Sequence, residues 1–76
     1  MTGSVKQFLR TAWDRENSHR LAYFDTDHGE MELADGEIET WLADPEKYNL
    51  SEGDIAVLTQ GLYACRAADT RGRFND

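Results

Sequence analysis

The sequence predicts a small α+β domain in the order α-β-β-α-α, with a two-stranded antiparallel hairpin packed on helices. Three observations predict it: helical spacing of apolar residues near the start, alternating polarity around a central run of turn formers, and strong helix-start signals before the last third. At 76 residues the chain has room for a single domain, 1–76. Chains of this size bury only about 60% of their unfolded surface, so we expect one small core.

The first predicted element is a helix over residues 4–17. Its apolar residues recur three and four positions apart, which is the spacing of one helical face. These residues are Val5, Phe8, Leu9, Ala12 and Trp13. Ser4 is a suitable N-cap, and Asn17-Ser18 marks the expected end of the helix.

The next segment predicts a β-hairpin. Residues 21–24 are rich in strand-forming aromatics, and residues 30–33 alternate polar and apolar side chains. Turn-forming residues occupy positions 25–29 between them. Because an isolated two-stranded hairpin is unstable in water, we expect the face with Met31 and Leu33 to pack on the helices.

Residues 35–43 fit two structures, because Asp35-Gly36 suits both a helix start and a hairpin turn. A third strand near 37–42 would place Glu32 opposite Glu39, a destabilising like-charge pair. A helix instead suits the apolar spacing and the acidic first turn. We therefore favour a helix and keep the third strand as the alternative.

The start of the last helix is the most strongly specified feature of the sequence. Ser51 is the expected N-cap, Asp54 stands at the capping-box position, and Leu50 can contact Ile55 as a hydrophobic staple. Gly61 costs about 1 kcal/mol inside a helix. It therefore marks either a close contact or a break between two shorter helices.

The remaining sequence signals exclude several classes of protein. No apolar run approaches the roughly 18 residues of a membrane span, and no signal-peptide pattern is visible, so we expect no membrane association. The only cysteine, Cys65, cannot form an intramolecular disulfide, which favours a reducing, cytoplasmic setting. Its position on the apolar stripe of the last helix predicts a core residue. Residues 70–76 are expected to form a flexible polar tail.

No metal site, cofactor or catalytic centre is expected. His19 and His28 lack the paired spacing of zinc ligands, and residues 25–30 start like a calcium loop but continue with the wrong residues. Phosphate-binding loops, nucleophile elbows and catalytic triads are all missing from the sequence. The protein is therefore not expected to be an enzyme.

The charge of the chain is strongly segregated. The net charge is -7, but residues 25–54 hold 11 of the 15 acidic residues against Lys47 alone, and the flanking segments are mildly basic. This field repels nucleic acid and attracts basic protein surfaces. Solubility alone is an equally weighted explanation. The predicted partner-binding residues are Asp25, Asp27, Glu30, Glu32, Asp35, Glu37, Glu39 and Trp41.

A short acidic chain with this charge block and no catalytic motif resembles, in character, the small phage-encoded anti-defence proteins, including anti-CRISPR proteins and DNA mimics. The resemblance implies a non-enzymatic cytoplasmic inhibitor or adaptor that occupies a basic, nucleic-acid-binding surface of a partner complex. The alternatives are a helix-turn-helix-like regulator formed by residues 37–69 and a small housekeeping globular protein. The marginal core also favours a homodimer, because association buries surface that a short chain leaves exposed.

Overall fold

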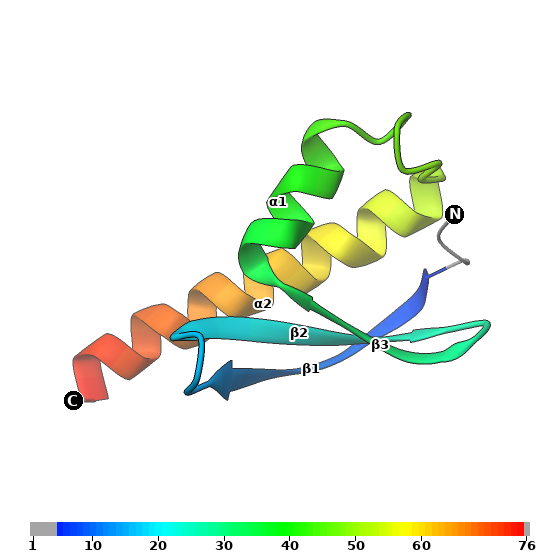
Figure 1. The fold of residues 1–76 in the computed structure, drawn as a ribbon. Helices are drawn as coiled ribbons and strands as arrows, with labels where there is room; N and C mark the ends of the chain where they lie inside the picture. The colour runs from blue at the N-terminus through cyan, green and yellow to red at the C-terminus, as the bar shows by residue number, and fades with distance from the viewer. Residues whose placement is uncertain (1–4, 76) are drawn as a thin grey trace.

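Three strands and two helices make up the fold. The computed structural model describes the backbone of residues 5–75 and the side chains of residues 5–68. The elements are β1 (Val5–Asp14), β2 (His19–Thr26), β3 (Gly29–Ala34), α1 (Asp35–Ala43) and α2 (Glu52–Asn75). The strands form an antiparallel sheet in the order β1-β2-β3, and both helices lie on one side of it (Figure 1). The small α+β domain is confirmed, but its sheet has three strands and its first element is not a helix.

The predicted helix over residues 4–17 is wrong, because this segment forms β1. Two register shifts in the pairing with β2, one after Val5 and one after Phe8, each insert an extra residue into β1. Val5, Phe8 and Thr11 therefore face the same side of the sheet although they are three residues apart. The bulges give a strand the apolar spacing of a helix. Ser4, the expected N-cap, lies outside the described residues.

The hairpin of β2 and β3 is confirmed, and its turn consists of Asp27 and His28. The Thr26 hydroxyl accepts a hydrogen bond from the His28 backbone N–H at 3.1 Å and donates one to the Gly29 carbonyl at 2.7 Å. Gly29 has φ of +108°, a conformation that glycine adopts without steric cost. Leu33 is buried and Met31 packs against the core, as expected for the helix-facing side.

The helix over residues 35–43 is also confirmed, so the alternative strand near 37–42 is wrong. The N-cap of α1 is Ala34, and Asp35 is the first helical residue. The backbone N–H of Ala34 donates a hydrogen bond to the Glu37 carboxylate at 3.2 Å, which supplies half of a capping box.

The start of α2 forms the predicted capping box. The Ser51 hydroxyl accepts a hydrogen bond from the backbone N–H of Asp54 at 3.1 Å, and the Asp54 carboxylate accepts one from the backbone N–H of Ser51 at 3.0 Å. The second carboxylate oxygen accepts a hydrogen bond from the Val5 backbone N–H at 2.9 Å. Asp54 is only 6% exposed, so one buried carboxylate caps α2 and ties its start to β1.

Gly61 marks a close contact between α2 and the sheet, not a break in the helix. A Cβ atom at this position would lie 2.7 Å from Cε2 of Phe24 and still closer to Cζ of the same ring. The helix continues through residues 70–75, so most of the predicted tail has a helical backbone. The flexibility of that segment stays a prediction, and its side chains lie outside the described part of the chain.

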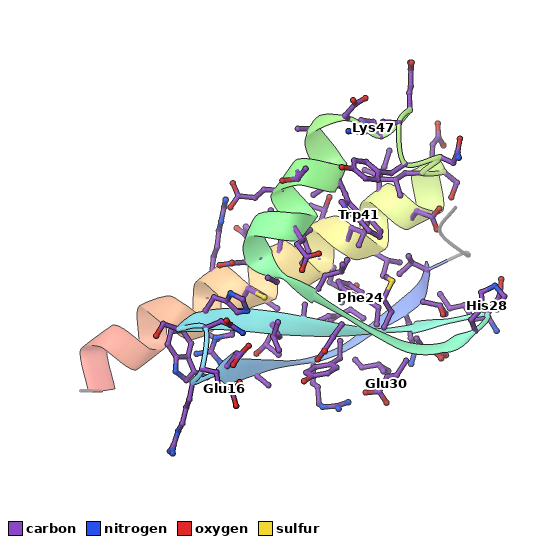
Figure 2. The ribbon with its side chains drawn as sticks, viewed as in Figure 1. Glu16, Phe24, His28, Glu30, Trp41 and Lys47 are labelled. Atoms are coloured by element: carbon purple, nitrogen blue, oxygen red, sulfur yellow. The ribbon has the colours of Figure 1, made fainter. Side chains whose placement is uncertain are left out.

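The core lies between the helices and the sheet. Its largest fully buried side chains are Phe24 on β2, Ile38 on α1, and Leu58 and Cys65 on α2. Phe24 points from the sheet toward the helices in Figure 2. The prediction that Cys65 is a core residue is therefore confirmed. Among the described residues, no helix is both long and apolar enough to cross a membrane.

Candidate protein-binding surface

The face of the sheet turned away from the helices is the main candidate surface. Successive residues of a strand point to opposite faces, and directly paired residues share a face. Glu30 points away from the helices in Figure 2. From the strand register, the same side, here called the open face, holds Gln7, Arg10, Ala12, Leu21, Tyr23, Asp25, Glu30 and Glu32.

Two carboxylates stand directly opposite each other on the open face. Asp25 of β2 pairs with Glu30 of β3. Like charges in this position destabilise a sheet. The Glu30 carboxylate is compensated by Arg10, whose Nη2 lies 2.9 Å from its Oε1. Asp25 has no such ion pair among the described side chains. Asp25 is thus a carboxylate of the open face that a further cation could neutralise.

Tyr23 lies between the charged groups of the open face. The Arg10 guanidinium carbon is 4.3 Å from the centroid of the Tyr23 ring, within the range of a cation–π contact. A hydrogen bond to the Glu32 carboxylate is the main cause that raises the pKa of Tyr23 above 10.0. The Tyr23 ring and the Glu30 carboxylate thus both contact Arg10.

The eight predicted partner-binding residues do not form one continuous surface. Asp25, Glu30 and Glu32 share the open face, and Asp27 lies beside them in the hairpin turn, where the Lys6 ammonium is 3.2 Å from its carboxylate. The other acidic residues, Asp35, Glu37 and Glu39, belong to α1, on the helical side of the sheet. The acidic segment is therefore divided between two sides of the molecule.

The acidic residues of α1 have structural partners. Glu37 accepts the hydrogen bond from Ala34, and Glu39 forms an ion pair with Arg66 of α2, at 3.1 Å. Asp35 accepts a hydrogen bond from the backbone N–H of Gly36 at 2.8 Å. These contacts cap α1 and link it to α2, so all three carboxylates have partners within the chain, and their role in partner binding stays a prediction.

Trp41 packs mainly against other residues of the same chain. Its ring is partly buried against the core and stacks on Tyr48, with ring centroids 5.3 Å apart and planes inclined by 15°. The stack fastens the loop of residues 44–51 to α1. Trp41 therefore does not stand on the open face beside Glu30 and Glu32.

Sequence reasoning missed the contribution of β1 to this surface. Lys6 and Arg10 come from the mildly basic first segment, and they pair with acidic residues of the hairpin formed by β2 and β3: Asp27 in its turn and Glu30 in β3. The bulges hid the strand pattern, so the approach of Arg10 to Tyr23 and Glu30 could not be anticipated. The approach of Arg10 to these residues is predictable only when residues 5–14 are recognised as a strand antiparallel to β2.

The two histidines and the cysteine lie in three separate places. His28 is in the hairpin turn, His19 begins β2 beside Asp14, and Cys65 is buried in α2. No group of three His, Cys, Asp or Glu residues among the described residues is arranged to hold a metal ion.

Neither a protein-family model, nor a curated protein, nor a solved structure matches this chain. The likeness to small anti-defence proteins in size and charge therefore stays a prediction. On the open face, two carboxylates of like charge, Asp25 and Glu30, stand directly opposite each other.

Proposed function

We propose that the protein is a non-enzymatic inhibitor or adaptor whose open face binds a basic surface of a partner protein. The observation that carries this proposal is the like-charge pair of Asp25 and Glu30 on the uncovered side of the sheet. A partner lysine or arginine placed next to Asp25 would relieve the repulsion within the pair. Binding would then gain from a stabilisation that the free protein lacks.

The favoured partner surface is one that normally binds nucleic acid. Such surfaces present lysine and arginine to phosphates, and clustered carboxylates can take the place of those phosphates. The net charge of -7 disfavours direct binding of nucleic acid by the protein itself. An anti-defence inhibitor, of the anti-CRISPR kind for example, is the version of this proposal that the size and charge of the chain favour.

The test compares partner capture by three forms of the full chain from extracts of its source organism. Asp25→Asn combined with Glu30→Gln, here called the double variant, removes the two charges of the like-charge pair on the open face. The matched control is Asp44→Asn combined with Glu46→Gln, which also removes two charges, at exposed positions of the loop of residues 44–51. Mass spectrometry would identify proteins retained by the wild type and by the control but lost with the double variant.

Purified partner and protein would then be titrated at increasing salt. We expect affinity to fall steeply with salt and by about tenfold or more in the double variant, because rim and steering charges are screened within about 10 Å at 0.1 M salt. Binding that is independent of salt, or unchanged in the double variant, would rule out the open face as the binding surface.

The helix-turn-helix alternative gains no specific support. Residues 37–69 fall in α1 and α2, and the first turn of α2 carries Glu52 and the buried Asp54. A recognition helix needs basic or neutral groups there to approach phosphates. A gel-shift assay with pure protein and duplex DNA would detect such binding and would reverse this ranking.

A further inference from the structure

The outer side of α2 differs from the rest of the surface. Its core side consists of Asp54, Leu58, Gly61 and Cys65, all buried. A second set of residues, spaced three or four apart, lies on the opposite side of the helix and is exposed throughout. This set, called the outer stripe, is Ala56, Thr59, Gln60, Tyr63 and Ala67.

The outer stripe has no charged residue, although 30% of the chain is charged. Every exposed position of α2 between Gly53 and Arg66 is neutral. The stripe also holds Tyr63, which is 79% exposed and is the most exposed large apolar side chain of the described residues. Exposed aromatics surrounded by neutral residues are typical of interface centres, from which charged residues are depleted.

Charge favours a second copy of this chain as the occupant of the outer stripe. A partner rich in lysine and arginine finds no carboxylate to pair with there. Two copies, each with a net charge of -7, repel each other wherever their acidic residues come together. The outer stripe has no acidic residue, so a contact between two outer stripes avoids this repulsion. Self-association through this surface therefore avoids the like-charge contacts that the acidic surfaces would produce.

We propose that two copies associate through antiparallel α2 helices, related by a two-fold axis between Thr59 and Gln60. This register places Tyr63 of each copy against Ala56 of the other. The two-fold axis therefore produces two equivalent contacts, and in each a large side chain packs over a small one. It also brings Glu52 of one copy toward Arg66 of the other. A parallel pair would bring Glu52 to Glu52 and Arg66 to Arg66, which is unfavourable.

The test is sedimentation equilibrium of the full chain over a concentration series into the millimolar range. We expect a monomer–dimer equilibrium that salt leaves unchanged or strengthens, since salt screens the repulsion between the two net charges. Ala56→Glu and Tyr63→Ala should each weaken the dimer by about tenfold or more. Both positions are exposed, so the variants should keep the wild-type circular dichroism.

Lys47→Gln is the matched control for Ala56→Glu, because it changes the net charge by the same amount at an exposed position in the loop of residues 44–51, outside α2. It should leave the dimer within about twofold of wild type. A protein that stays monomeric over the whole series would overturn the proposal. A dimer equally sensitive to Lys47→Gln, or insensitive to Ala56→Glu and Tyr63→Ala, would place the contact elsewhere and would overturn it as well.

Discussion

Gly61 shows how one residue sets the distance between two layers of the fold. The ring of Phe24 lies where a Cβ atom at position 61 would be, and Phe8 contacts the same ring edge-on, with centroids 5.8 Å apart. Because Phe24 is fully buried, its ring has little room to move. The absence of a side chain at position 61 thus permits the close approach of α2 to the sheet.

We predict that Gly61→Ala destabilises the protein by about 1–3 kcal/mol, because overpacking outweighs the gain of about 1 kcal/mol in helix propensity. Gly36→Ala in α1 is the control, since nothing lies within 4 Å of a Cβ atom there. The control should be neutral or stabilising by up to about 1 kcal/mol. Urea denaturation measures both, and equal stabilisation by the two substitutions would contradict the close contact.

Asp25 is the second residue whose effect can be predicted. Asp25→Asn removes the repulsion from Glu30 and should raise the free energy of unfolding by about 0.2–1 kcal/mol. The same substitution should weaken partner binding if the open face has the proposed function. Thermal and urea unfolding of Asp25→Asn and of the Glu46→Gln control measure the first effect. A loss of stability specific to Asp25→Asn would show that this carboxylate has a structural role.

At the scale of the elements, Asp54 connects the start of α2 to the start of β1. Its carboxylate accepts hydrogen bonds from Ser51 at the start of α2 and from Val5 at the start of β1, in a nearly dry environment. Sequence spacing predicts the first contact, because both partners belong to one helix start. The second joins residues 49 positions apart and depends on how the helix crosses the sheet.

We predict that Asp54→Asn destabilises the protein by about 1–3 kcal/mol. The amide keeps one acceptor, but its NH₂ group faces a backbone N–H and leaves a buried donor without a partner. Glu52→Gln, exposed in the same turn, is the control and should change stability by less than about 0.5 kcal/mol. Urea denaturation measures both, and amide exchange at Val5 should accelerate in the Asp54 variant alone.

The turn between β1 and β2 is held by Asp14. Its carboxylate accepts a hydrogen bond from the Asn17 side chain at 2.9 Å and further ones from the backbone N–H groups of Glu16 and Asn17. The Asn17 side chain is the main cause that lowers the pKa of Asp14 below 3.8. His19, whose Nε2 lies 3.4 Å from Asp14, contributes a smaller effect in the same direction.

A lowered pKa in the folded state means that the Asp14 carboxylate stabilises the fold above its unfolded pKa. This contribution should diminish as the pH falls below about 3.8 and disappear below the folded pKa. The difference in unfolding free energy between wild type and Asp14→Asn should therefore shrink in acid. An NMR titration should show the pKa of Asp14 move back toward its usual value in Asn17→Ala, and no movement would contradict the assignment.

At the scale of the whole molecule, the two proposed surfaces face in different directions. The outer stripe lies on the side of α2 away from the sheet, and the open face lies on the side of the sheet away from the helices. Association through α2 would leave both open faces accessible to partners. The two contacts also respond oppositely to salt, which weakens binding at the open face and does not weaken the neutral helix contact. Failure of one proposal therefore leaves the other testable.

Local signals predicted the elements that depend on neighbouring residues. The hairpin turn, the α1 helix and the capping box at Ser51 each involve groups within a few positions of one another. Their contacts can therefore be predicted from the local sequence pattern. The close contact at Gly61 was anticipated as one of two explanations. For the candidate site, the sequence showed that residues 25–54 are acidic. It did not show that these acidic residues are divided between the open face and α1.

The sequence by itself determined the α+β class, the hairpin, the two helices after it and the net charge of -7. Only the tertiary structure decided that residues 5–14 are a strand, since a bulged strand shows its period only against its partner. It also decided which charges meet. Arg10 neutralises Glu30 because antiparallel pairing brings residues 20 positions apart together, and that proximity is a property of the sheet and not of the local sequence.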